Sequence, residues 1–148
     1  MRILLAIDDS KYSEAAIETV IEQARAQETE VRVLHVVEPP TLLVAREMGG
    51  YDPALENAWE SQRHQADVVV AKAVEVLRAR GLKVTAAVED GDPKSKILDV
   101  AEEWQADLIV LGSHGQKGLS RFLMGSIPDA VARHAHCSVE IVRIRPAH

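Results

Sequence analysis

The chain has 148 residues, 47% hydrophobic and 27% charged, which is long and apolar enough for one globular domain and excludes a disordered segment. Its formal net charge of -6 and its aromatic content of 3% argue against nucleic-acid binding, which needs a basic surface and stacking platforms. No apolar run approaches the ~20 residues of a membrane span, and the N-terminal residues lack the long apolar region of a signal peptide, so we expect a cytoplasmic protein with no membrane segment.

The first half of the chain alternates between strand-like and helix-like patterns. The apolar run from Arg2 to Asp8 is typical of a strand buried on both faces, and the β-branched run from Val31 to Val37 predicts a second strand. Between them, residues 10–27 place apolar side chains at helical spacing. Two prolines end the second strand, so we expect an irregular connection over residues 41–53.

The alternation continues after this connection. A long helix is predicted from Ala54 to Arg80, with Gly81 well placed to cap its C-terminus. A weaker strand follows over residues 83–89. The next helix is expected to begin with Asp92 as N-cap and Pro93 as its first residue.

The last third of the chain predicts two more strands around one helix. Residues 106–112 are apolar apart from Asp107 and indicate a central strand, and residues 138–145 indicate the final strand. The intervening helix is expected to have Ser126 as N-cap and Asp129 in the acidic position of a capping box.

This order of elements predicts an α/β fold of one domain over residues 1–148. We expect an open five-stranded parallel sheet, strand order 3-2-1-4-5, with helices on both faces, a Rossmann-like arrangement. In such a sheet, ligands bind at the carboxyl ends of the strands where the winding reverses. That point lies between the first and fourth strands, which end at Asp8 and Gly112.

The segment from Gly112 to Ser126, GSHGQKGLSRFLMGS, holds four of the eight glycines and no acidic residue. Glycines let a ligand approach the main chain, exposed N–H groups form a concavity for anions, and a helix N-terminus adds further donors. With Lys117 and Arg121, the segment suits a phosphate chain. The alternative is a loop whose glycines only permit a tight crossover. Neither a P-loop nor a GxGxxG motif is present.

The glycine spacing resembles the nucleotide-binding motif of the universal stress protein family: Gly112-x2-Gly115-x9-Gly125-Ser126. The likeness extends to AIDDS, LHVV, DLIVLGSHG and GSIPDAVARHAHCSVEIVR, and so covers nearly the whole chain. Asp9 and Ser138 depart from the usual pattern, which has glycine and proline there. The resemblance implies the α/β fold, a homodimer formed through the last strands, and ATP as ligand, since the complete motif marks the ATP-binding subset.

Carried over by position, the resemblance implies an adenine-nucleotide site. The first two glycines and the residues between them would wrap the ribose and phosphates, the residues around Ser126 would hold the phosphate end, the end of the first strand would lie beside the adenosine, and Val36 would contact the adenine. The expected site residues are Ala6, Ile7, Asp8, Val36, Leu111, Gly112, Ser113, His114, Gly115, Gly125, Ser126 and Ile127. Ser126 is also a candidate ligand for Mg²⁺. Asp8 suits hydroxyl or amino groups better than phosphate, and it alternatively only caps the first helix.

Three features outside the motif carry further expectations. His35 is predicted to be a hydrogen-bonded core residue, and Cys137 a small packing residue. The last strand forms a sheet edge, which pairing with a second copy would cover. Alternatively, the charged side chains of Arg143 and Arg145 prevent pairing at this edge, and the protein is a monomer.

The main functional prediction is a homodimeric ATP-binding stress or signalling protein. ATP would shift residues 113–124 between ordered and mobile states, and a downstream protein partner would read the difference. No activated nucleophile or general base stands out, so we expect no enzyme. The alternatives are a nucleotide-independent dimeric interaction protein of the same fold and a slow Mg²⁺-dependent ATPase.

Overall fold

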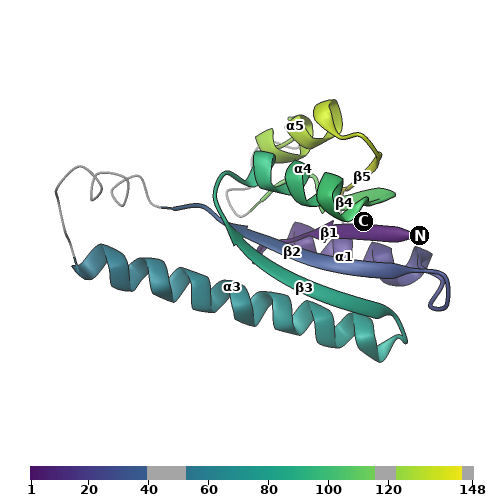
Figure 1. The fold of residues 1–148 in the computed structure, drawn as a ribbon, viewed down its shortest axis with the longest axis horizontal. Helices are drawn as coiled ribbons and strands as arrows, with labels where there is room; N and C mark the ends of the chain where they lie inside the picture. The colour runs from purple at the N-terminus through teal and green to yellow at the C-terminus, as the bar shows by residue number, and fades with distance from the viewer. Residues whose placement is uncertain (40–52, 116–122, 145–148) are drawn as a thin grey trace.

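A computed structural model describes residues 1–39, 53–115 and 123–144 of the chain (Figure 1). The elements are β1 (Arg2–Ala6), α1 (Lys11–Gln23), β2 (Glu30–Val37), α3 (Pro53–Ala79), β3 (Lys83–Asp90), α4 (Pro93–Trp104), β4 (Leu108–Gly112), α5 (Ser126–His134) and β5 (Ser138–Val142). The strands form one parallel sheet in the order β3-β2-β1-β4-β5, so the predicted fold class and strand order are confirmed.

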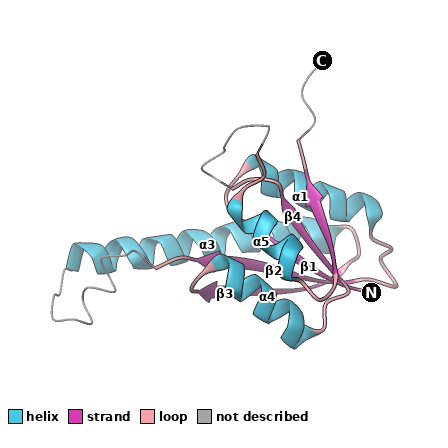
Figure 2. Cartoon of the chain, turned by 90° about the horizontal axis from the view of Figure 1, so that it is seen from above, coloured by secondary structure: helices cyan, strands magenta, loops and turns pink. Residues whose placement is uncertain are grey.

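Each face of the sheet carries its own hydrophobic core, because successive side chains of the central strands point to opposite faces. Leu5 and Val110 belong to the core covered by α1 and α3, whereas Leu4 and Ile109 belong to the core covered by α4 and α5. Figure 2 shows the helices arranged around the sheet in this way. Cys137 packs against the second core, as predicted.

Two helix ends follow the local signals of the sequence. Gly81 has φ of 81°, a left-handed conformation in which glycine carries no steric penalty, and it follows the end of α3. Asp92 is the N-cap of α4, where its carboxylate accepts a hydrogen bond from the N–H of Ser95 at 3.3 Å, and Pro93 is the first helical residue. Both predictions are confirmed.

The predicted start of α5 is wrong by one residue. Gly125 is the N-cap, because its carbonyl accepts the first helical hydrogen bond, from the N–H of Asp129 at 3.1 Å. Ser126 is therefore already inside the helix. The Asp129 carboxylate does not reach back as in a capping box but accepts a hydrogen bond from Nε of Arg133 at 3.0 Å, one turn further along.

Other boundaries differ by a few residues. β1 ends at Ala6 and not at Asp8, and α1 ends at Gln23 and not at residue 27. The irregular connection predicted over residues 41–53 lies outside the described residues except for its last position. Within the described ranges, no helix combines the length and the apolar character needed to cross a membrane.

Candidate functional site

The carboxyl ends of the two central strands lie side by side. Ala6 pairs with Leu111 at the end of the β1–β4 register, so Ile7–Asp8 and Ser113–Gly115 leave the sheet next to each other. A Cβ added to Gly115 would lie 2.9 Å from Oδ2 of Asp8. The structure therefore brings Asp8 and the start of the glycine segment together at the point where the winding reverses.

The Asp8 carboxylate is held in place by Ser13, in the first turn of α1. The hydroxyl oxygen of Ser13 accepts a hydrogen bond from the N–H of Asp8 at 2.7 Å and donates one to Oδ1 of Asp8 at 2.8 Å. Ser13 is 5% exposed, and its own N–H donates to the hydroxyl of Ser10, the N-cap of α1. Since Oδ1 is committed to Ser13, the other carboxylate oxygen lies on the side of Gly115.

Gly112 is required for the packing of α1 on the end of β4. A Cβ at this position would lie 2.6 Å from Cβ of Tyr12 and 3.0 Å from the carbonyl carbon and oxygen of the same residue. Real Cβ atoms do not approach other atoms so closely, so a side chain here would have to displace the start of α1. The packing of α1 thus explains why position 112 is a glycine, which the motif alone did not reveal. Contact of Gly112 with a ligand stays a prediction.

Ser113 and His114 join the two ends of the glycine segment. Nδ1 of His114 lies 3.0 Å from the hydroxyl oxygen of Ser113, and Nε2 is hydrogen-bonded to the carbonyl oxygen of Leu123. A neutral ring that accepts from Ser113 and donates to Leu123 satisfies both contacts. The buried ring also packs against Tyr12, with ring centroids 5.1 Å apart. Both ring nitrogens of His114 have protein partners, so among the described residues only its main-chain N–H is left without an acceptor.

Gly125 brings the start of α5 against the end of β4. Its N–H donates to the carbonyl oxygen of Ser113 at 2.9 Å, and an added Cβ would lie 3.2 Å from the same oxygen. The first N–H groups of a helix have no partner within the helix. This close approach therefore places the unpaired donors of α5 near those that follow β4.

Within the described residues, several main-chain N–H groups at this edge have no protein acceptor: those of His114, Gly115, Ser126 and Ile127. The N–H of Ser113 is not among them, because it donates to the carbonyl oxygen of Val142 in β5 at 2.8 Å. Two short segments thus supply converging donors of the kind that binds anions.

The apolar residues of the predicted site divide between the two faces of the sheet. Ala6, Leu111, Val36 and Ile127 belong to or pack against the core covered by α4 and α5. Ile7 belongs instead to the core covered by α1 and α3. An apolar ring system at this edge would meet the first group, and Ile7 would contribute only its main chain.

His35 does not match its prediction. It is partly buried in β2, but its Nδ1 is buried and has no hydrogen-bond partner in the part of the chain that the structure describes. Burial lowers the pKa of His35 below the ordinary value of 6.5, and the carboxylates of Asp8 and Asp9 raise it by less. The side chain is therefore a neutral imidazole at pH 7 and not a satisfied core residue.

Sequence reasoning missed Ser13 and Tyr12. Ser13 follows the N-cap Ser10 by three residues, a spacing that could have indicated a buried hydroxyl behind the first turn of α1. The closeness of Tyr12 to Gly112 had no local signal, because it depends on how α1 packs on β4. Lys117 and Arg121, predicted to add positive charge, lie outside the described residues.

The sequence matches the model of the universal stress protein family over residues 1–143. The chain belongs to this family. It is similar to the universal stress protein MJ0531 of Methanocaldococcus jannaschii, with 29% identity over 96% of this chain and 81% of the relative. It is also similar to the putative universal stress protein SAUSA300_1656 of Staphylococcus aureus, with 31% identity over 95% of this chain and 82% of the relative.

Solved structures of universal stress proteins share the fold. The structure of the hypothetical protein MJ0577 has a TM-score of 0.86 and 25% identity, covering 99% of this chain and 97% of that one. A universal stress protein of Archaeoglobus fulgidus in complex with dAMP has a TM-score of 0.63 and 24% identity, covering 95% and 96%. An Arabidopsis thaliana family member with AMP bound has a TM-score of 0.71 and 17% identity, covering 98% and 92%.

Proposed function

We propose that this universal stress protein binds an adenine nucleotide, ATP in particular, at the carboxyl ends of β1 and β4. The observation that carries the proposal is the convergence of main-chain N–H groups after β4 and at the start of α5 that have no acceptor in the described part of the chain, joined by the hydrogen bond from Gly125 to Ser113. The AMP and dAMP complexes of proteins with the same fold support an adenine nucleotide as the ligand class.

The two ends of the site suit the two ends of a nucleotide. The N–H groups of Gly115, Ser126 and Ile127 would donate to phosphate oxygens, each charge-assisted bond contributing about 1.5–3 kcal/mol. Asp8 would repel phosphate but can accept hydrogen bonds from ribose hydroxyls or an amino group. The apolar group that includes Val36 and Leu111 would pack against the base.

Magnesium would enter with the phosphates and not as a resident ion. Among residues 1–39, 53–115 and 123–144, no group of three His, Cys, Asp or Glu side chains could hold a metal. The exposed hydroxyl of Ser126, in the first turn of α5, is the protein oxygen that would ligate Mg²⁺ carried by ATP.

Binding would act as a conformational signal in a cytoplasmic homodimer. β5 is one edge of the sheet, and antiparallel pairing with the same strand of a second copy would satisfy its unpaired main-chain groups. Nucleotide contacts after β4 would order residues 113–124, and a partner protein would recognise that state. Sedimentation at micromolar concentration should show twice the monomer mass.

Calorimetric titration with ATP, AMP, adenosine and inorganic phosphate tests the site. We expect micromolar binding of ATP to the unmodified protein and at least a hundredfold weaker binding to Gly115→Val, whose side chain would enter the space beside Asp8. A folded Gly115→Val protein that binds ATP tightly would contradict the proposed phosphate site. If millimolar ATP produced no heat of binding, the alternative function, a nucleotide-independent interaction protein of the same fold, would be favoured.

A second variant tests the orientation of the nucleotide. Asp8→Ala should weaken the binding of adenosine about tenfold and leave that of inorganic phosphate nearly unchanged. Equal losses for both ligands would place the carboxylate at the phosphate end. Slow ATPase activity would appear as phosphate release that Ser126→Ala removes while it retains ATP binding.

A further inference from the structure

The chain just before α5 is held against the end of β4 by hydrogen bonds and not by burial of its own side chains. Leu123 and Met124 are 64% and 37% exposed, so the hydrophobic core does not fix this part of the chain. α5 itself packs on α4 and β5. Its approach to the end of β4 therefore depends on the contacts between residues 113–114 and residues 123–125.

Two hydrogen bonds make this connection, one from the main chain and one from a side chain. The N–H of Gly125 donates to the carbonyl oxygen of Ser113 at 2.9 Å. Two residues earlier, the carbonyl oxygen of Leu123 is bonded to Nε2 of His114. A single hydrogen bond lets a segment pivot about it, whereas two bonds at different points also fix its direction. The bond from His114 thus sets the angle at which the chain enters α5.

The ring of His114 is itself held in one orientation. A carbonyl oxygen only accepts, so Nε2 must carry the proton that it shares with Leu123. Nδ1 lies 3.0 Å from the hydroxyl oxygen of Ser113 and accepts from it when the ring is neutral. The ring of Tyr12 packs against it, with planes at 50°, and His114 is only 9% exposed. These contacts keep Nε2 directed at Leu123.

The first turn of α1 supports both sides of the site. Tyr12 packs against the ring of His114, and the next residue, Ser13, donates to the Asp8 carboxylate at 2.8 Å. Adjacent residues of one helix therefore position the group expected at the adenosine end and the ring that supports the phosphate end.

We propose that His114 is a positioning residue whose side chain does not contact the nucleotide. Its Nε2–H group holds Leu123 so that the N–H groups of Ser126 and Ile127 face the same space as the N–H of Gly115. This inference rests on the proposed nucleotide site and deepens it. The histidine ring serves the main chain of the protein, and the nucleotide meets donors that are already in place before it binds.

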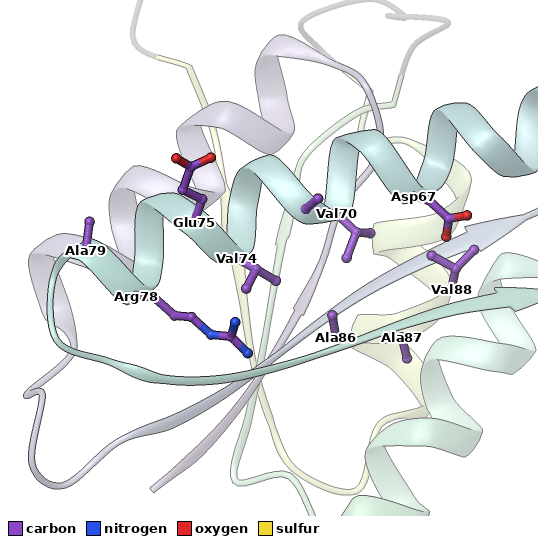
Figure 3. A pocket seen from close by; sticks show the side chains of 10 residues that line it. Asp67, Val70, Val74, Glu75, Arg78, Ala79, Ala86, Ala87 and Val88 are labelled. Carbon is purple, nitrogen blue, oxygen red and sulfur yellow. The ribbon is translucent and has the colours of Figure 1, made fainter.

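The α3–β3 groove, at the opposite edge of the sheet from β5, is a poor site for an anion (Figure 3). Its volume is about 910 Å³, and alanines and valines line it together with Asp67, Glu75 and Arg78 of α3. Nη2 of Arg78 already donates to the carbonyl oxygen of Val84 at 3.0 Å, and the two carboxylates would repel phosphate. We therefore expect phosphate groups to report on the end of β4 and not on this groove.

Two substitutions of His114 separate its bond to Leu123 from the rest of the ring. Glutamine reaches as far as Nε2 and can donate there, whereas asparagine reaches only as far as Nδ1. In the ligand-free protein, the N–H of Gly125 should exchange with deuterium at least about tenfold faster in His114→Asn than in the unmodified protein. His114→Gln should restore most of the protection.

His134→Asn is the matched control, because it makes the same substitution at an exposed position of α5 and should leave the exchange of Gly125 unchanged. Equal exchange in the unmodified and His114→Asn proteins would overturn the proposal. Equal acceleration in His114→Asn and His114→Gln would also overturn it, because the donor to Leu123 would then not matter.

Calorimetry with ATP and adenosine tests what this support does for binding. His114→Asn should bind ATP about tenfold more weakly and adenosine less than about twofold more weakly, because the support acts at the phosphate end. His114→Gln should regain the ATP affinity to within about threefold. If exchange changed as expected but ATP affinity did not, His114 would support the fold without positioning the donors, and the inference would be wrong. An unmodified protein that bound no ATP would contradict the proposed function, and the exchange rates would still decide whether His114 holds the start of α5.

The unmodified protein offers a test that needs no substitution. Nitrogen-15 NMR of the histidine rings should find a proton on Nε2 of His114. A ring protonated only at Nδ1 would leave the carbonyl of Leu123 without this donor and would overturn the proposal, even if the variants failed to fold.

Discussion

The end of β4 and the α3–β3 groove are built in opposite ways. At the end of β4, glycines bring main-chain segments into contact, and polar side chains such as Ser13 and His114 are buried and hydrogen-bonded. The groove is open and is lined by alanines and valines, together with the charged residues Asp67, Glu75 and Arg78 of α3. The first arrangement suits a small anion that needs precisely directed donors, whereas the second leaves small apolar side chains beside open space.

The largest difference between the two regions should appear when a side chain is enlarged. Gly112→Val would force a Cβ to within 2.6 Å of Tyr12, and we expect a loss of about 3 kcal/mol or more of unfolding free energy. Ala86→Val adds two methyl groups at an exposed position on the groove side of β3 and should change stability by less than about 0.5 kcal/mol. Urea denaturation measures both. Similar losses would mean that the groove is as tightly packed as the site.

Removal of a buried hydroxyl should have the next largest effect. Ser13→Ala leaves the N–H of Asp8 without its acceptor and frees the carboxylate, at a cost of about 1–3 kcal/mol in unfolding free energy and about tenfold in ATP affinity. Ser95 makes the same kind of bond to Asp92, at 2.9 Å, on the exposed N-terminus of α4.

Ser95→Ala is the matched control for this prediction. It should cost less than about 1 kcal/mol and leave ATP affinity unchanged, because water can replace an exposed hydroxyl. If Ser13→Ala lowered stability but not ATP affinity, Ser13 would support the fold without positioning Asp8 for a ligand.

The smallest expected effect is a dependence of stability on pH that comes from His35. Because burial lowers its folded pKa below 6.5, the unfolded chain binds more protons as the pH falls through and below 6.5. The contribution of the neutral ring to stability is thus complete above pH 6.5 and is lost as the pH falls towards the folded pKa. His35→Gln should remove this part of the pH dependence, measured as the difference in urea midpoint between pH 7.5 and 5.5. If His35→Gln left the difference in urea midpoint unchanged, the pH dependence of stability would come from other titratable groups.

Local sequence signals accounted for most of the fold. Short apolar or β-branched runs identified the strands and a period of 3.6 identified the helices that the structure describes, and Gly81, Asp92 and Pro93 marked helix ends correctly. The N-cap of α5 was the exception. Serine is a common N-cap, but at this helix the close contact with Ser113 places Gly125 in the capping position.

The site was predictable in position but not in detail. Strand order and glycine spacing placed Asp8 beside Gly115, because parallel strands end at one edge of the sheet. They did not reveal that the ring of His114 is hydrogen-bonded within the protein, nor that the N–H of Ser113 belongs to β5. These partners are separated along the chain, so they become neighbours only when the helices pack.

By itself, the sequence determined the α/β architecture, the order of the strands and the edge of the sheet at which the candidate site lies. These properties follow from periodicity, chirality and chain connectivity, which are local or topological. Only the tertiary structure decided which glycine is needed for packing, which main-chain donors remain free and where the two ends of β3 lie relative to α3. Those outcomes depend on contacts of a few ångströms between distant segments, which no pattern along the chain specifies.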